Sequence, residues 1–239
     1  MRLDDPHLLF TSVAMLGSAG APTVLLRLML QERVGVETGA RWLGPGLALG
    51  LAAIAVCALV PALVGGSLEW GHDGALALVG AGLQQLVCLG PTAVGEELLV
   101  RGLGFQALAR GTRPAIAVAV SGAIFGLLHL SNPNASALAA ANVALVGWWL
   151  GALTVRTGSL WPAIGVHLAW NFGEGFVFGT PVSGLEPARA LVHAVAPEAG
   201  FFAGGAFGPE ASGFTAAVLL ACLVVTCLWP APRASAPNA

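Results

Sequence analysis

Long apolar runs separated by short polar segments make up most of this chain. A helix needs about 20 mostly apolar residues to cross a bilayer, and several runs have roughly that length. Because backbone groups in lipid must be hydrogen-bonded within the segment itself, these runs predict an all-α, polytopic transmembrane helix bundle. We expect seven clear spans, near residues 8–30, 45–66, 74–90, 113–130, 136–155, 159–178 and 213–229.

The composition agrees with a membrane protein and argues against other classes. Hydrophobic residues make up 56 % of the 239 and charged residues only 9 %, against roughly a quarter in a soluble domain. The net charge of −2 and the lack of basic clusters exclude nucleic acid as an expected partner. All ten cations are Arg, in an Ala- and Gly-rich chain. This usage favours a GC-rich bacterial genome, and with it a multi-pass protein of the bacterial cytoplasmic (inner) membrane.

No repeat or linker divides the chain, so residues 1–239 are expected to form a single integral membrane domain. The segment 179–212 holds several prolines and glycines, which disfavour regular helix over its whole length. The Pro- and Ala-rich tail, residues 230–239, is predicted to be disordered.

Residues 91–112 are ambiguous because their hydropathy is intermediate. As a surface helix they would leave seven spans, and the loop arginines would then gather on one side of the membrane, in agreement with the positive-inside rule. Alternatively, Pro91 breaks the chain after the third span, and residues 93–110 form an eighth, short, buried helix. That helix would end at Gly111, before Pro114 opens the next one. On this interpretation the loop arginines are split between the two sides.

Ionisable side chains within the apolar runs mark the candidate site, because at membrane depth they usually face a bundle interior or a water-filled cavity. Three pairs have the i,i+4 spacing that places both members on one helix face. They are Glu97 with Arg101, Phe125 with His129, and His167 with Asn171. Glu96 lies about 100° around the helix from Glu97, so Arg101 need not neutralise it.

Depth along the membrane favours eight helices. Glu96 lies 16 positions before Thr112, and His129 lies 17 after it. If the chain turns near Thr112, two antiparallel helices bring these residues to nearly the same height. His167 is in the middle of its run, with Asn171 one turn further toward the same end. The surface-helix alternative would separate Glu96 from His129 and leave no shared site.

These motifs resemble the CPBP family of intramembrane proteases, which includes the type II CAAX prenyl endopeptidases and bacteriocin-processing or bacteriocin-immunity proteins. The resemblance covers about residues 91–230, which are then the expected protease core, and the run "GGAFGPE" at 204–210 is similar to bacterial members. Three motifs carry it in order: Glu96-Glu97 with Arg101, Phe125 with His129, and His167 with Asn171.

The resemblance implies hydrolysis of a peptide bond in a peptide or lipid-modified protein within the membrane. A poorly solvated glutamate suits a general base, so Glu96 is expected to activate a water, with His129 holding or sharing its proton. By the resemblance, His167 and Asn171 would donate hydrogen bonds to the oxyanion. Three residues are assigned supporting roles: Glu97 and Arg101 as a structural ion pair, and Phe125 as part of the pocket wall.

Three alternatives remain open at this point. Glu96, His129 and His167 are also suitable ligands for a catalytic zinc, although no cofactor is the favoured expectation. A non-catalytic scaffold or immunity protein could use the same fold to bind a peptide. A transporter could use the acids and histidines as a relay, but the sequence shows no inverted repeat to support one.

Overall fold

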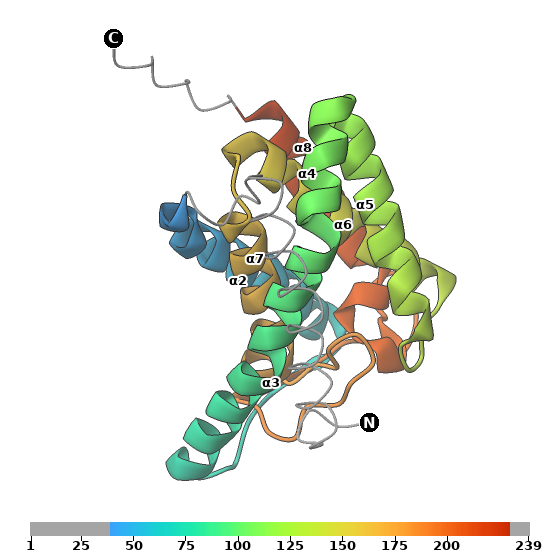
Figure 1. The fold of residues 1–239 in the computed structure, drawn as a ribbon. Helices are drawn as coiled ribbons and strands as arrows, with labels where there is room; N and C mark the ends of the chain where they lie inside the picture. The colour runs from blue at the N-terminus through green and yellow to red at the C-terminus, as the bar shows by residue number, and fades with distance from the viewer. Residues whose placement is uncertain (1–38, 230–239) are drawn as a thin grey trace.

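A computed structural model describes residues 39–229 of the chain as a helical bundle with one small sheet (Figure 1). The predicted first span, 8–30, and the predicted disordered tail lie outside the described residues. The helices are α2 (Leu43–Gly65), α3 (Ala75–Arg101), α4 (Leu103–Gly111), α5 (Pro114–Leu128), α6 (Ala137–Thr157), α7 (Trp161–Phe172) and α8 (Gly213–Leu228).

The number of membrane-crossing helices differs from the predicted count. Within residues 39–229, four helical segments are long and apolar enough to cross a membrane: Ala40–Gly65, Ala75–Gly111, Pro114–Ser131 and Ala137–Thr157. The runs expected at 159–178 and 213–229 form the shorter helices α7 and α8. The expectation of about eight helices, seven of them clear spans, is therefore not confirmed.

The ambiguous region forms neither a surface helix nor the separate helix expected at 93–110. Helix α3 runs unbroken through Pro91 to Arg101, and the chain breaks instead at Gly102, where φ is −68° and ψ is −141°. Pro91 has no N–H to donate to the Val87 carbonyl, but membrane helices tolerate a proline where local adjustment or neighbouring groups satisfy the freed carbonyl. Here α3 keeps its helical conformation for ten residues beyond Pro91.

Helices α4 and α5 form the predicted antiparallel pair around the turn at Thr112 (Figure 1). Pro114 opens α5 at its first position, as expected. The pairing thus survives the correction above, because the end of α3 together with α4 takes the place of the single helix predicted there.

Glycines allow the helices of the core to approach closely. Gly50 and Gly46 of α2 face the backbone of α7, and Gly122 and Gly126 of α5 face α6. Small residues at such interfaces are typical of helix packing in membranes. Buried Trp149, at the centre of α6, belongs to the same core. The packing fixes the position of α7, which lies between α2, α3 and α6.

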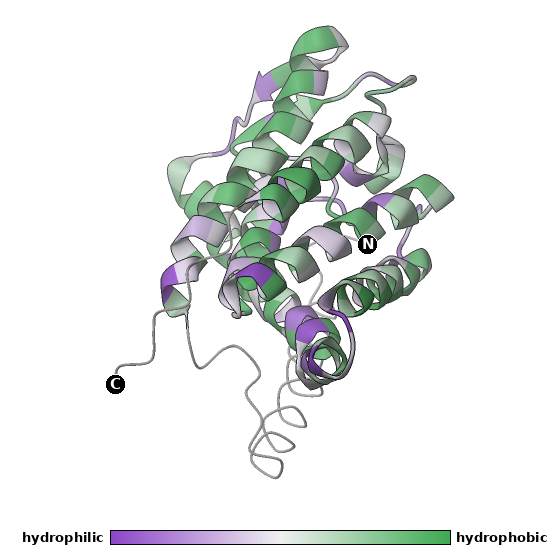
Figure 2. Cartoon of the chain, turned by 90° about the horizontal axis from the view of Figure 1, so that it is seen from above, coloured by the Kyte–Doolittle hydropathy of each residue, from purple (hydrophilic) through white to green (hydrophobic). Residues whose placement is uncertain are grey.

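The segment between α7 and α8 is mostly irregular, as predicted, but it adds a feature that the all-α expectation lacked. Strand β2 (Val192–Val195) pairs antiparallel with β1 (Ser67–Trp70). A π-helical turn, Gly173–Val177, continues α7, and two short 3-10 turns, Gly205–Phe207 and Pro209–Ala211, precede α8. Figure 2 shows the helices as hydrophobic over most of their length, with hydrophilic residues confined to short stretches.

Candidate functional site

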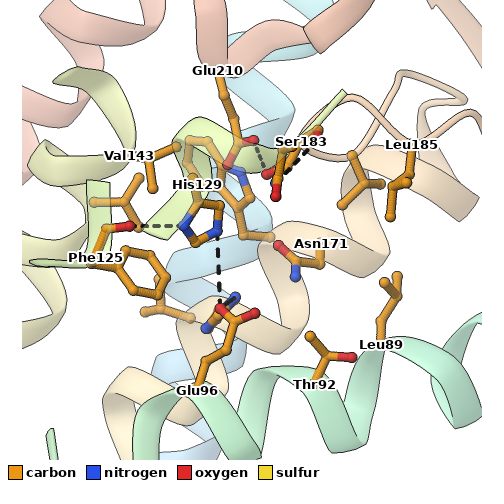
Figure 3. Close-up of a pocket in the computed structure, with 16 residues that line it drawn as sticks. Leu89, Thr92, Glu96, Phe125, His129, Val143, Asn171, Ser183, Leu185 and Glu210 are labelled. Atoms are coloured by element: carbon orange, nitrogen blue, oxygen red, sulfur yellow. Dashed lines mark hydrogen bonds and ion pairs between the residues drawn. The ribbon is translucent and has the colours of Figure 1, made fainter. Parts of the chain in front are cut away.

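A cavity of about 190 Å³ lies between α3, α5, α6, α7 and the segment that follows α7 (Figure 3). Five of the predicted site residues line it: Glu96, Phe125, His129, His167 and Asn171. The remaining two, Glu97 and Arg101, are fully buried beside it. The structure therefore brings together all seven residues of the three motifs.

The Glu96 carboxylate on α3 points toward both histidines. Its Oε2 lies 4.0 Å from the Nε2 of His129 and 3.8 Å from the Nε2 of His167. Both distances exceed the range of a direct hydrogen bond, and this buried oxygen has no hydrogen-bond partner. The side chain of Glu96 is 16 % exposed, so the carboxylate faces the cavity rather than packed protein.

The ring of His129 is held in one tautomer by its own helix end. Its Nδ1 lies 2.8 Å from the carbonyl oxygen of Phe125, one turn earlier in α5. A carbonyl oxygen only accepts hydrogen bonds, so Nδ1 carries the hydrogen. The Phe125 ring packs against the imidazole at 4.6 Å between centroids. The Nε2 of neutral His129 is thus left with a lone pair that faces Glu96.

Glu97 binds two partners, of which the sequence predicted one. Its Oε1 accepts from the Nη1 of Arg101 at 3.0 Å, the expected i,i+4 pair, and also lies 3.0 Å from the Nδ1 of His167. Arg101 also donates from Nη2 to the Gly147 carbonyl on α6 at 3.0 Å and stacks over the Phe125 ring. Glu97 therefore does more than pair with Arg101, because it also fixes the orientation of His167.

Asn171 lies one turn after His167 on α7, with its side chain at the cavity (Figure 3). The positions of His167 and Asn171 place two potential hydrogen-bond donors on one wall of the cavity. Among residues 39–229, no cluster of three or more His, Cys, Asp or Glu side chains is arranged to hold a metal ion.

Two further acids were missed from the sequence. Glu210, in the turn Pro209–Ala211, lines the cavity and accepts a short hydrogen bond from the hydroxyl of Ser183. Glu174, in the π-helical turn, is fully buried, and neither carboxyl oxygen has a hydrogen-bond partner. Burial raises the pKa of the Glu174 carboxyl, and the charge of Glu210 raises it further.

A signal for Glu174 was present in the sequence. It is an acid within the apolar run 159–178, the same criterion that singled out Glu96. Glu210 gave no such hydropathy signal, because it lies in a Gly- and Pro-containing loop where an acid is ordinarily solvated. It does end the run "GGAFGPE" at 204–210 that is similar to bacterial members, but that similarity assigned it no role.

Comparison with known proteins supports the resemblance seen in the motifs. Residues 79–173 match the family described as "Type II CAAX prenyl endopeptidase Rce1-like". A stretch of 80 residues, 32 % of this chain, is 35 % identical to the uncharacterized protein YyaK of Bacillus subtilis (strain 168) and spans 27 % of that protein. No solved structure matches this chain. The segment 79–173 includes the whole of the three motifs, whereas Ser183 and Glu210 lie beyond it.

Proposed function

We propose that this integral membrane protein, which carries an Rce1-like protease segment over residues 79–173, is an intramembrane endopeptidase in which Glu96 activates a water molecule. The family match and the four apolar helices indicate a protease in a membrane. The observation that carries the finer proposal is the gap around Oε2 of Glu96, which is bounded by the Nε2 atoms of His129 and His167.

In this proposal a water molecule bridges the gap. Two polar atoms 4.0 Å or 3.8 Å apart are too distant for a direct bond, but one water at about 2.8 Å from each can bridge them. Glu96 would then accept one proton of the water, while the lone pair on Nε2 of His129 accepts a hydrogen bond from the other. The water oxygen becomes the nucleophile as Glu96 takes its proton.

The tetrahedral intermediate places a negative charge on the former carbonyl oxygen, which needs donors already in place. In this proposal they are the side-chain amide of Asn171 and a protonated Nε2 of His167. Because Nδ1 of His167 donates to Glu97, a second proton on Nε2 makes the ring an imidazolium. Two negative charges, Glu96 and Glu97, then meet two positive ones, Arg101 and His167, so the buried group is neutral overall.

The substrate class follows from the position of the site. We propose a peptide, or a protein with or without a lipid modification, whose cleaved bond enters the cavity from within the bilayer or its surface. A side wall of apolar residues, including Leu89, Val143 and Leu185, suits an apolar segment of the substrate. Prenylation is not required by any feature of the cavity.

A zinc-dependent version would use Glu96, His129 and His167 as ligands. Zinc lies about 2.0–2.1 Å from imidazole nitrogen and carboxylate oxygen, so tetrahedral ligand atoms lie about 3.4 Å apart. The observed separations of 3.8 and 4.0 Å lie between this value and the roughly 4.6 Å set by a bridging water about 2.8 Å from each atom at a tetrahedral angle. The response of cleavage to a chelator therefore separates the two versions.

The test is cleavage of a quenched peptide library, prenylated and unprenylated, by the purified protein in liposomes. We expect Glu96→Gln to lower kcat by at least about 10²-fold, in the range for loss of a general base, and His129→Ala and His167→Ala to lower it as well. Glu69→Gln, at an exposed acid on β1, is the matched control and should leave cleavage unchanged.

Three results would redirect the proposal. Full activity of Glu96→Gln would overturn the assignment of the base. Loss of wild-type activity in a chelator, restored by added zinc, would favour the metal-dependent version. A protein that folds and binds peptides without cleaving any of them would favour a scaffold or immunity role.

A further inference from the structure

Glu210 lies on the wall of the cavity opposite Glu96, on the other side of His129 (Figure 3). It comes from the turn Pro209–Ala211, just before α8, and is 5 % exposed. The mechanism above gives this acid no role, although its carboxyl group lines the same cavity as the proposed base.

The surroundings of Glu210 hold it in one place. The buried amide of Asn142 on α6 donates to the backbone carbonyls of Glu210 at 2.7 Å and of Ser212 at 2.9 Å. The Ser183 hydroxyl donates to Oε2 of Glu210, and the Ser183 carbonyl accepts from Asn132 at 3.3 Å. Three side chains from separate parts of the chain therefore fix one acid at the cavity wall.

Ser183 lies in a tight turn that places its hydroxyl at the cavity. Val182 and Leu185 close the turn with two backbone hydrogen bonds of 2.9 Å each. Both central residues have positive φ, 47° at Ser183 and 87° at Gly184, as two-residue hairpin turns of this kind require. Here the conformation coincides with the hydrogen bond that Ser183 gives to Glu210.

Peptide hydrolysis needs an acid as well as a base. The carbon–nitrogen bond of the tetrahedral intermediate breaks only when the leaving nitrogen receives a proton, because an amine is expelled far more readily than an amide anion. Neither nitrogen of His129 faces Glu210: Nδ1 is bonded to the Phe125 carbonyl and Nε2 faces Glu96. A proton donor on the opposite wall would therefore be a separate group.

We propose that Glu210 is the acid that protonates the leaving amine. Glu96 removes a proton from water, and the hydroxide forms a bond to the carbonyl carbon. The carbon–nitrogen bond then breaks as the Glu210 carboxyl gives its proton to the nitrogen, which leaves as a neutral amine. The proton held by Glu96 returns to Glu210 through solvent in the cavity after the products leave, so that no further reactant is consumed.

The protonated form of Glu210 is favoured by its environment. Burial raises the pKa of the Glu210 carboxyl. The hydrogen bond from Ser183 and the positive forms of His129 and His167 oppose this and lower the pKa of Glu210. The two other titratable groups that face it are the buried acid Glu174 and Cys57 on α2. Because the Ser183 hydroxyl donates to Oε2, Oε1 is the oxygen that carries the proton.

The test rests on the proposed function and compares two leaving groups. The probes are the peptide cleaved fastest in the library and its analogue with a thioester at the cleaved bond. A thiol leaves as the thiolate, with a pKa of about 8.5, and so needs no proton from the enzyme. Glu210→Gln keeps the size of the side chain and an acceptor for Ser183 but has no proton to transfer.

We expect Glu210→Gln to lower kcat for the amide by about 10²–10³-fold and for the thioester by less than about tenfold. Glu210→Asp, which keeps the acid, should retain an amide-to-thioester ratio near that of the wild type. Glu186→Gln, at an exposed acid in the same loop, should change neither rate.

Equal losses on the two substrates, or full amide activity in Glu210→Gln, would overturn the assignment of the leaving-group acid. The proposed function is tested separately by Glu96→Gln, which should lose both substrates because both require an activated water. If Glu96→Gln cleaves the amide normally, the base assignment fails, whatever the result at Glu210.

Discussion

Replacing Glu97 by Gln would show how much the buried charges depend on one another. Glu97 accepts from Arg101 and from His167, each at 3.0 Å, and the side chains of Glu97 and Arg101 are both 0 % exposed. The substitution preserves shape but removes the negative charge. It leaves the Arg101 guanidinium bonded to the Gly147 carbonyl but without the carboxylate that pairs with it.

Two estimates of the cost agree. A hydrogen bond to a charged group contributes about 1.5–3 kcal/mol, so losing two charged bonds costs about 3–6 kcal/mol. Removal of one partner of a buried ion pair costs about 3–5 kcal/mol, because the other charge stays buried and unpaired. For a protein of this size each kcal/mol shifts Tm by about 2–4 °C. A Tm lower by roughly 10 °C is therefore expected.

The assay is thermal unfolding in detergent of the wild type, Glu97→Gln, Arg101→Met and the double variant, with Glu69→Gln as the control. Since the loss comes mainly from the unpaired cation, the double variant should be more stable than Glu97→Gln alone. A double variant whose Tm loss equals the sum of the two single losses would refute the coupling. So would a Glu97→Gln protein as stable as the control.

Three further predictions follow from other parts of the fold. Burial raises the pKa of Glu174, so its bound proton contributes stability that is fully present below the unfolded pKa of about 4.3 and is lost as pH rises through the folded pKa. Glu174→Gln should therefore have a higher Tm than the wild type at pH 8, and the difference in Tm should shrink toward pH 5. Gly50→Ala would bring a Cβ to 2.7 Å from a Cα atom of α7, so we expect the free energy of unfolding to fall by about 1–3 kcal/mol and cleavage to decrease. The control is Gly80→Ala on α3, whose added Cβ meets no atom within 4 Å and which should leave the Tm unchanged or slightly higher. Asn142→Ala removes both bonds that hold the Glu210 turn and should lower kcat more for the amide than for the thioester; an unchanged ratio would show that the turn holds its position without Asn142.

The sequence predicted the helices best where an apolar run is bounded by Gly or Pro. The spans expected at 45–66, 113–130 and 136–155 correspond to α2, α5 and α6 within a few residues. The prediction failed at Pro91, which was assumed to break a helix as it does in water. In an apolar setting the backbone gains nothing by opening, so α3 continues until Gly102. There φ is −68° and ψ is −141°, a combination that is neither helical nor extended and that a residue without a Cβ adopts most readily.

The site was predicted as far as local spacing and depth allow. The i,i+4 pairs and the depth match of Glu96 with His129 are properties of single helices and of one hairpin. The bond from His167 to Glu97 joins residues 70 positions apart, and it depends on how α7 packs against α3. The place of Glu210 depends on the irregular segment before α8, whose path no periodicity describes.

Glu96 and Glu97 are neighbours on one helix, and the helical geometry explains why their chemistry differs. Glu96 and Glu97 point about 100° apart, so one helix presents one acid to the cavity and the other to the core. Glu97 pairs with the Arg101 guanidinium on α3 and is hydrogen-bonded to the His167 ring on α7. Oε2 of Glu96 faces the Nε2 atoms of the two histidines, across gaps of 3.8 and 4.0 Å. An acid that is buried but not directly hydrogen-bonded at that oxygen is able to bind water there. The roles of Glu96 and Glu97 therefore follow from what surrounds each side chain, since the two residues are chemically identical.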